Sequence, residues 1–255
     1  MKKFDGIVLL TDLDGTLLYN AEMPENNRHA IKYFTENGGI FSVATGRAPD
    51  FIKRKIPYIN APVCALNGAL IYDLKRERTL KEYFLPSKSL DAAREISACF
   101  NPIRINVFSF TENPFINPKP SDFDGFSKKI HKIVFIFDSE EMTVSAKKCL
   151  TEKYSDTGEI FRSWNTGLEI IPKDGGKGKC LEFIKQYVGA KTAVGAGDYE
   201  NDFSLLSAAD IACAPSDAHE EILKIADFIS VSAQDGAIDA IIKMLDEKIS
   251  KGIDL

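Results

Sequence analysis

The chain has 255 residues, of which 44% are hydrophobic and 27% charged, a composition typical of a soluble globular protein with one large or two modest domains. Its net charge of −5 provides no basic surface for nucleic acid or an anionic membrane, and no apolar run reaches the ~20 residues of a membrane span. The five cysteines are scattered without a CxxC pair, which favours free thiols in a reducing cytosol, so we expect a cytoplasmic protein, and no protein partner is indicated.

Strands and helices are predicted to alternate along the first part of the chain. The predicted elements lie at about 6–12, 24–37, 40–44, 48–55 and 62–66. Pro24 suits the first turn of the first helix, and Gly38-Gly39 end that helix. Strands that alternate with helices favour a parallel sheet covered on both faces.

The middle of the chain has a different pattern. Residues 69–84 are predicted to form a hairpin, and two helices and several short strands follow, at about 87–99, 103–110, 131–137, 140–153, 158–163 and 167–171. The segment 111–126 carries three prolines and three phenylalanines and is predicted to be a long loop. These elements indicate a separate α+β unit.

The alternation of helices and strands returns in the last third of the chain. The predicted elements lie at about 177–188, 192–196, 200–208, 210–213, 227–231 and 236–249, with a further helix after Ser216. We expect them to complete the parallel sheet that the first part of the chain begins.

The most informative segment is VLLTDLDGTLL, near the amino terminus. Asp12 and Asp14 follow an apolar strand, and residues two apart on an extended segment point the same way. Gly15 allows a sharp turn out of the strand, and open α/β sheets bind their ligands at this edge. Because two adjacent carboxylates repel each other, a metal or a shared proton is expected there. A pair of this kind on its own is more often a solvated acidic turn.

Three further segments lie at predicted strand ends. They are VATGR, which contains Thr45, KDGGKGKCLEF, which contains Lys177, and VGAGDYENDFSLL, which contains Asp198 and Asp202. In this order, and with the first segment, they resemble the four motifs of the haloacid dehalogenase-like superfamily, whose members are mostly phosphatases. The arrangement is similar to the Cof-type branch of that superfamily, and the resemblance covers nearly the whole chain.

The resemblance implies an α/β fold, with a Rossmann-like parallel-sheet core and an inserted α+β cap domain. The stretch 46–176 between the second and third motifs is far longer than the stretch 17–44 between the first and second, so the extra domain must lie there. We predict a discontinuous core of residues 1–81 and 172–255, and a mobile cap of residues 82–171 over the phosphate site.

The resemblance also implies the chemistry of phosphoryl transfer. Asp12 would attack phosphorus and form an aspartyl-phosphate, while Asp14 would protonate the leaving oxygen and then deprotonate the attacking water. Mg²⁺ would be bound by the Asp12 side chain, the Asp14 backbone carbonyl and Asp198, and Asp202 would hold metal-bound water. The alternative for the GDYEND segment is an acidic helix cap, which explains one carboxylate better than a matched cluster.

Phosphate oxygens are expected to bind to Thr45 and to the amides around Gly46, where a helix begins. Lys177 would hold the nucleophile and the phosphate together although both are anions. Lys179 is the alternative lysine in the GKGK segment, but the family's lysine precedes a glycine as Lys177 does. Asn201 would either orient Lys177 or reach the phosphate.

Four other residues are candidates with open alternatives. Arg47 would contact either the cap or the polar groups of the substrate, and Trp164 would either contact the substrate or pack within the cap. Asn67 would either anchor a loop near the site or form a simple turn. Asp217 stands where many Cof-type relatives carry Asn, and it either adds negative charge near the metal or faces solvent.

The function that this resemblance predicts is magnesium-dependent hydrolysis of small phosphorylated metabolites, with sugar phosphates as the favoured substrates. A phosphomutase, or a more specialised sugar-phosphate phosphatase of a neighbouring branch, is the alternative enzyme. A sensor that binds a phosphorylated ligand without turnover is a third hypothesis. Substrate selection is expected to depend on the cap, above all on the loop 111–126 and on the segment around Trp164.

Overall fold

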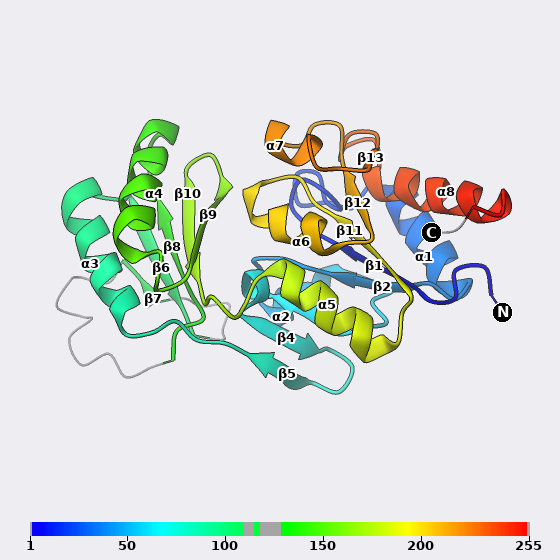
Figure 1. Ribbon diagram of the computed structural model, residues 1–255, viewed down its shortest axis with the longest axis horizontal. Helices are drawn as coiled ribbons and strands as arrows, with labels where there is room; N and C mark the ends of the chain where they lie inside the picture. The colour runs from blue at the N-terminus through cyan, green and yellow to red at the C-terminus, as the bar shows by residue number, and fades with distance from the viewer. Residues whose placement is uncertain (1, 110–114, 118–128, 254–255) are drawn as a thin grey trace.

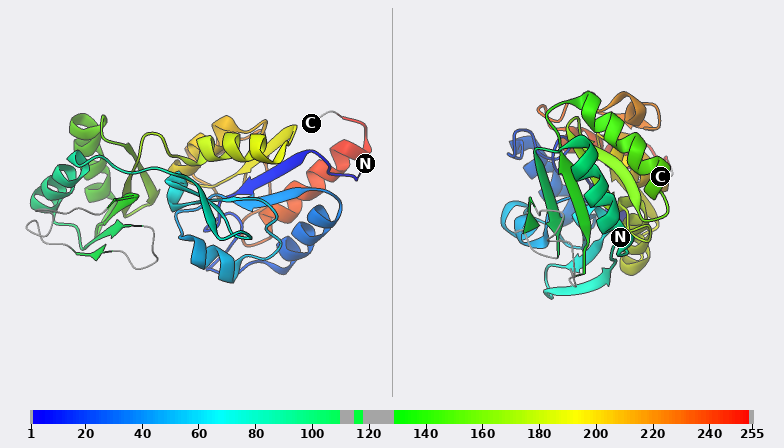
Figure 2. Two further views of the ribbon diagram at one scale, coloured as in Figure 1. Left: turned by 90° about the horizontal axis from the view of Figure 1, so that it is seen from below. Right: turned by 90° about the vertical axis from the view of Figure 1, so that its left-hand side faces the viewer.

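The computed structural model describes residues 2–109, 115–117 and 129–253 of the chain. Figure 1 shows a core and a smaller cap beside each other, each with its own sheet. The molecule is elongated, and both termini lie at the end of the core that is remote from the cap (Figure 2). This arrangement confirms the predicted Rossmann-like core with an inserted α+β cap. The boundaries at residues 82 and 172 stay a prediction.

The core contains a five-stranded parallel sheet in the order β13-β12-β11-β1-β2. Its strands are β1 (Ile7–Thr11), β2 (Ile40–Val43), β11 (Thr192–Ala196), β12 (Ile211–Ala214) and β13 (Phe228–Ile229). The helices around it are α1 (Glu25–Glu36), α2 (Pro49–Lys55), α5 (Lys177–Val188), α6 (Phe203–Ala208), α7 (Glu220–Leu223) and α8 (Ala237–Ser250). The predicted helix at 200–208 begins as a short 3₁₀ turn, Glu200–Asp202.

Strand β1 is apolar from Ile7 to Leu10 because both faces of the sheet are covered. Leu9 packs in the cluster formed with α1 and α8, whereas Val8 and Leu10 pack in the cluster formed with α5 and α6. All five residues of β1 are buried. Successive side chains of a strand point to opposite faces, so one continuous apolar run serves both layers. The strand therefore holds the residues that follow it in a fixed place.

The strand predicted at 62–66 lies outside the parallel sheet. β3 (Val63–Ala65) joins β4 (Leu70–Asp73) and β5 (Arg78–Glu82) in a three-stranded antiparallel sheet. Only one parallel bridge, between Ala44 and Cys64, links β3 to the end of β2. A short turn leads from β3 into β4, and a connection of this length permits antiparallel pairing only. The predicted hairpin of 69–84 is confirmed by β4 and β5.

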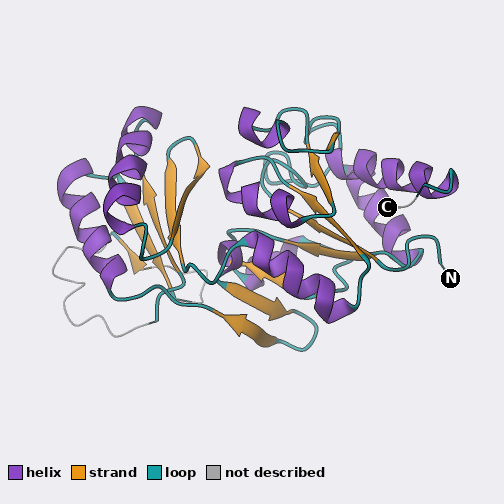
Figure 3. Ribbon diagram, in the orientation of Figure 1, coloured by secondary structure: helices purple, strands orange, loops and turns teal. Residues whose placement is uncertain are grey.

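The cap is a five-stranded antiparallel sheet in the order β7-β6-β8-β10-β9, with two helices on one face. Its elements are α3 (Lys88–Phe100), β6 (Arg104–Phe108), β7 (Phe115–Ile116), β8 (Lys132–Ile136), α4 (Glu140–Tyr154), β9 (Glu159–Trp164) and β10 (Gly167–Ile171). Figure 3 shows both helices on the side of the sheet that is turned away from the core. Of the predicted loop 111–126, only 115–117 belongs to the described residues, and the remainder lies outside them.

The two faces of the cap sheet differ in character because side chains alternate along each strand. Ile105, Val107, Ile133 and Phe135 pack against α3 and α4 in the cap's apolar core. The residues between them on the same strands point the other way, toward the parallel sheet, and include Arg104, Asn106, Phe108, Lys132 and Val134. The cap therefore presents a polar wall to the core.

Among the described residues, no helix combines the length and the apolar character needed to cross a membrane.

Gly68 and Gly176 bring two segments of the core into contact. Gly68 has a φ of +94°, and a Cβ built on it would lie 2.4 Å from backbone atoms of Gly176. Gly176 is the residue directly before α5, the helix that begins with Lys177. Only glycine combines this backbone conformation with so close an approach. The contact places the start of α5 beside the turn that follows β3.

We expect Gly68→Ala to destabilise the protein more than Gly189→Ala does. Both glycines have positive φ values, but nothing lies within 4 Å of a Cβ at Gly189. Gly189→Ala should therefore cost only the left-handed backbone strain, about 1 kcal/mol, and Gly68→Ala about 2 kcal/mol more from the steric overlap. Denaturant unfolding of both variants measures the difference. Equal losses of stability would contradict the close contact.

Candidate active site

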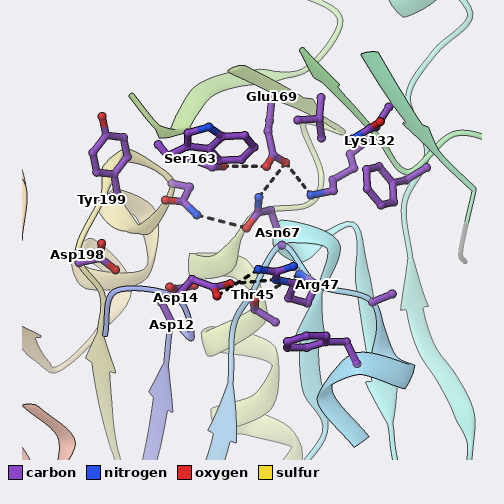
Figure 4. Close-up of a pocket in the computed structure, with 18 of the residues that line it drawn as sticks. Asp12, Asp14, Thr45, Arg47, Asn67, Lys132, Ser163, Glu169, Asp198 and Tyr199 are labelled. Carbon is purple, nitrogen blue, oxygen red and sulfur yellow. Dashed lines mark hydrogen bonds and ion pairs between the residues drawn. The ribbon is translucent and has the colours of Figure 1, made fainter. Parts of the chain in front are cut away.

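A cavity of about 940 Å³ lies between the carboxyl edge of the core sheet and the polar wall of the cap. Figure 4 shows the side chains that line it, with core residues on one side and cap residues on the other. The core contributes Asp12, Asp14, Thr45, Gly46, Arg47, Asn67, Asp198 and Asn201, among others. The cap contributes Arg104, Asn106, Phe108, Lys132, Ser163, Trp164, Asn165 and Glu169. Residues from the first, second and fourth motifs therefore line one cavity together with Trp164, whereas Lys177 and Asp202 lie behind its wall.

Lys177 is buried between two carboxylates. Its Nζ lies 2.5 Å from Oδ1 of Asp12 and 2.5 Å from Oδ1 of Asp202. Burial alone would lower the pKa of the Lys177 ammonium, but the charges of Asp12 and Asp202 outweigh burial and raise that pKa. Lys177 is thus a permanent cation paired with Asp12, which lines the cavity. Lys179 instead donates to the backbone carbonyl of Lys173, so Lys177 is the lysine that reaches Asp12.

Three carboxylates converge around this lysine. Oxygen atoms of Asp12, Asp198 and Asp202 all lie within 4.8 Å of one another. Thr16 Oγ1 donates to Asp198 Oδ1 at 2.7 Å, and Oδ2 of Asp202 accepts from the backbone N–H groups of Asp198 and Tyr199. The cluster contains three carboxylates and only one ammonium group, that of Lys177. Its net negative charge therefore favours the binding of a further cation. Clustered carboxylate oxygens are the donors that Mg²⁺ prefers, and the residues fit that ion.

The excess negative charge changes the protonation of the cluster. Burial, together with the charge of Asp202, raises the pKa of Asp198 to about 7. Burial also raises the pKa of Asp12 well above its usual value, although the Lys177 charge opposes this effect. In the absence of a cation the cluster therefore holds protons near neutral pH.

Gly15 leaves the space that Asp198 needs. Gly15 has a φ of +93°, and a Cβ at this position would lie 2.5 Å from Oδ2 of Asp198. The turn after β1 can thus pass directly beside the loop after β11. The DGT sequence of the first motif is required by packing as well as by its carboxylates.

The second motif places Thr45 and Gly46 after β2 and opposite Asn67. Thr45 Oγ1 accepts from the backbone N–H of Arg47 at 3.2 Å, and the Thr45 carbonyl accepts from the backbone N–H of Asn67 at 2.8 Å. A Cβ on Gly46 would lie 3.1 Å from Nδ2 of Asn67 and 3.2 Å from Nζ of Lys132. The segment is therefore in contact with the cap as well as with the core. Helix α2 begins a little later, at Pro49.

Arg47 binds a core carboxylate in this structure. Its Nε and Nη2 donate to the two carboxylate oxygens of Asp14, at 3.0 and 3.2 Å, in a bidentate pair. The guanidinium also lies 4.8 Å from the centre of the Phe51 ring. Both charged side chains remain about half exposed to the cavity. The sequence predicted contacts with the cap or the substrate and did not predict this pairing.

Asn201 and Trp164 lie in the cavity wall with different surroundings. Asn201 Nδ2 donates to Asn67 Oδ1 at 3.4 Å, so its described contact is with Asn67 rather than with Lys177. Trp164 is 41% exposed and its Nε1 donates to Thr166 Oγ1, outside the apolar core of the cap. Asp217 accepts from the backbone N–H of Ala233, and its charge contributes to the raised pKa of Asp198.

The sequence interpretation missed a buried charged pair in the cap. Nζ of Lys132 lies 2.9 Å from Oε2 of Glu169, and both side chains are almost completely buried. Glu169 also accepts from Asn67 Nδ2 and from Ser163 Oγ, each at 2.9 Å. The available signal was a single charged residue inside each of two apolar strands, HKIVFIF and GLEII. A charge at such a position is rare unless it is paired.

The cap also contacts the core beside the loop that carries Asp198 and Asp202. Arg162 of β9 donates from Nε to Glu200 at 2.7 Å and from its backbone N–H to the same carboxylate at 3.0 Å. Lys147 of α4 lies 2.6 Å from Glu200, and Tyr199 donates to Asn165 at 2.8 Å. The cap therefore lies directly against the turn that carries Asn201 and Asp202.

Comparison with known proteins identifies the family of the chain. The sequence profile of a family described as haloacid dehalogenase-like hydrolase matches residues 9–124 and 109–242 of the chain. The chain is 26% identical over 284 residues to 5-amino-6-(5-phospho-D-ribitylamino)uracil phosphatase YwtE of Bacillus subtilis, covering 92% of this chain and 96% of that protein. It is 25% identical over 269 residues to the chloroplastic endoribonuclease YBEY of Arabidopsis thaliana, covering 91% of this chain and 45% of that protein. The chain thus spans less than half the length of the Arabidopsis relative.

A solved structure has the same overall fold. The HAD subclass IIB sugar phosphatase BT4131 superposes with a TM-score of 0.76 at 19% identity, covering 93% of this chain and 98% of that chain. At this identity the similarity shows the fold, with its core and its inserted cap. The profile match extends across far more than half of the chain and includes all four motifs. This chain belongs to the haloacid dehalogenase-like hydrolase family.

Proposed function

We propose that this protein is a magnesium-dependent phosphatase that hydrolyses small phosphorylated metabolites through an aspartyl-phosphate on Asp12. The observation that carries the proposal is the position of Asp12, held by the buried Lys177 at the base of a cavity that faces the cap. A release assay for inorganic phosphate, with Mg²⁺ and a panel of phosphorylated metabolites, tests it. No release from any member of the panel would overturn it.

In the first step, Asp12 attacks the phosphorus of the bound ester. Lys177 binds Oδ1 of Asp12, which leaves Oδ2 for the attack. A bond forms between Oδ2 and phosphorus while the bond from phosphorus to the leaving oxygen breaks, and Asp14 donates a proton to that oxygen. The side chain of Thr45 and the Gly46 amide bind the oxygens of the transferred group. The alcohol product then leaves through the cavity.

In the second step, Asp14 takes a proton from a water molecule that attacks the same phosphorus. The bond between phosphorus and Asp12 breaks, inorganic phosphate is released and the Asp12 carboxylate is restored. Arg47 now binds Asp14 through both oxygens, and an incoming phosphate would offer the guanidinium a second anion. Once released from Arg47, Asp14 would take up a proton from water, and this is the proton that it gives to the leaving oxygen in the first step.

Mg²⁺ would be held by the Asp12 side chain, the Asp14 backbone carbonyl and Asp198, and it would neutralise charge on the phosphoryl oxygens. Asp202 supports this group because it accepts from the backbone of Asp198 and from Lys177. Asp217 is not one of these ligands, but its negative charge contributes to the raised pKa of Asp198.

Sugar phosphates are the substrates that we propose. The cavity wall from the cap offers hydrogen-bonding side chains such as Asn106 and Asn165 together with the rings of Phe108 and Trp164. Such a wall suits a leaving group with hydroxyl groups on one side and an apolar ring face on the other. The fold of the sugar phosphatase BT4131 and the phosphate ester in the name of YwtE support this choice. The five free cysteines support a cytoplasmic location.

Asp12→Asn is expected to lower kcat by about a thousandfold or more while the fold persists. An amide is a poor nucleophile, and Lys177 keeps Asp202 as its second partner. Asp217→Asn is the matched control, because Asn retains the acceptor for the Ala233 N–H, and its activity should stay within about twofold of the wild type. Substantial turnover by the Asp12 variant would remove the covalent mechanism.

Asp14→Asn is expected to reduce turnover of a sugar phosphate more than that of 4-nitrophenyl phosphate. The nitrophenolate leaves without protonation, whereas a sugar alkoxide needs the proton that Asp14 supplies. We expect the two losses to differ by about tenfold or more, as measured by kcat/KM on both substrates. An equal loss on both esters would mean that Asp14 is not the general acid.

Magnesium binding is expected to weaken as the pH falls below 7. Protons then compete for Asp198, whose pKa is about 7. Because this pKa is raised above that of the unfolded chain, the metal-free protein should lose stability as the pH rises from 5 to 8. The increase in Tm on adding Mg²⁺ should therefore be larger at pH 8 than at pH 6, and Asp198→Asn should remove most of this difference. A shift in Tm that is independent of pH would contradict the assignment.

A further inference from the structure

Glu169 is a charged residue at the centre of the cap sheet, and its contacts lead into the core. It is 2% exposed and accepts three hydrogen bonds of 2.9 Å, from Lys132, Asn67 and Ser163 (Figure 4). A buried ion pair of this kind contributes little to stability, because the cost of removing both charges from water offsets their attraction. We therefore looked for a role of the Lys132–Glu169 pair other than stability.

Glu169 determines the orientation of the Asn67 amide. A carboxylate accepts hydrogen bonds only, so the Asn67 group that faces Glu169 must be Nδ2. Oδ1 of Asn67 then points to Asn201, whose Nδ2 donates to it at 3.4 Å. The remaining oxygen of Asn201, Oδ1, is buried without a hydrogen-bond partner among the described residues. One cap carboxylate thus orders two amides in succession at the wall of the cavity.

Both amides belong to segments that form the phosphoryl site. The backbone N–H of Asn67 donates to the Thr45 carbonyl at 2.8 Å, and Asn201 directly precedes Asp202, which binds Lys177. Asn67 has a φ of 55° and follows Leu66, which has a φ of 52°. Left-handed backbone at non-glycine residues is unfavourable and persists when surrounding contacts hold it. The bond from Glu169 is one such contact.

We propose that Glu169 is a positioning residue for phosphoryl transfer. When the cap is docked, Glu169 orients Asn67, and Asn67 in turn holds the Thr45 segment and Asn201 in place. The phosphoryl site is then complete only with the cap against the core, so that the ester reacts inside a closed cavity. This inference rests on the proposed phosphatase activity.

A double-mutant cycle between Glu169 and Asn67 tests the inference. Glu169→Ala should lower kcat by about 10- to 100-fold, and in an Asn67→Ala background the same change should lower it by less than about twofold. The loss in kcat should be the same for 4-nitrophenyl phosphate and for a sugar phosphate, because the phosphoryl group is common to both. Effects that multiply in the double variant would overturn the proposal, and so would a loss confined to one ester.

Glu169→Gln is the conservative variant. Its Oε1 can accept from Asn67 and Lys132 while its Nε2 donates to the Ser163 hydroxyl, so the order of the amides is preserved. We expect kcat within about threefold of the wild type. A loss as large as that of Glu169→Ala would overturn positioning through hydrogen bonds. If Glu169→Ala fails to fold, the double change Glu169→Leu with Lys132→Met takes the place of Glu169→Ala in the cycle. This double change removes both members of the buried ion pair and so leaves no unpaired charge.

Lys147→Gln is the matched control for docking of the cap. It removes a 2.6 Å ion pair between the cap and Glu200 but makes no contact with Asn67, and Arg162 still binds Glu200. Its kcat should stay within about twofold of the wild type. A loss equal to that of Glu169→Ala would overturn the specific role of Glu169. A wild-type protein that releases no phosphate would defeat the proposed function itself, whereas an active wild type with an additive cycle would defeat only this inference.

Discussion

The buried ammonium of Lys177 is the charge on which the rest of the site depends. Asp12, Asp198 and Asp202 would repel one another strongly in a space that excludes water, and Lys177 offsets part of that repulsion through two bonds of 2.5 Å. Asp12 is far along the chain from Lys177, Asp198 and Asp202. They meet because β1 and β11 are parallel neighbours in the sheet, and because the contact between Gly68 and Gly176 sets where α5 begins. Sheet topology and the close contact of two glycines thus bring the Lys177 ammonium next to the carboxylates.

The core and the cap use side-chain alternation for different purposes. In β1 both faces are covered, so the strand is apolar from Ile7 to Leu10 and only its last residue, Thr11, is polar. In the cap strands only one face packs on helices, and the other face carries Arg104, Asn106 and Lys132 into the cavity. Of this polar face, Lys132 and Glu169 are buried, whereas Arg104 stays exposed. The cavity is therefore lined by carboxylates from the core and by polar and aromatic side chains from the cap.

The contacts between cap and core are concentrated beside the reactive residues. Arg162 binds Glu200, two residues before Asp202, and Glu169 binds Asn67, whose backbone holds Thr45. Both links are charged or polar, and Phe108 of the cap also packs against the apolar cluster of the core. Polar interfaces of this kind allow domains to move relative to each other. The predicted movement of the cap over the phosphate site would break and re-form these polar contacts.

The sequence alone determined the alternation of strands and helices, the inserted cap and the residues of the four motifs, because these depend on local patterns and on order along the chain. Asp12, Lys177 and Asp198 could be named from their motifs, and the structure brings them together. Only the tertiary structure decided that Arg47 pairs with Asp14, that β3 joins an antiparallel sheet, and that Glu169 reaches Asn67. Each of these contacts joins side chains or strands whose partners are chosen by packing in three dimensions, and a partner that lies 102 residues away leaves no periodic signal in the sequence.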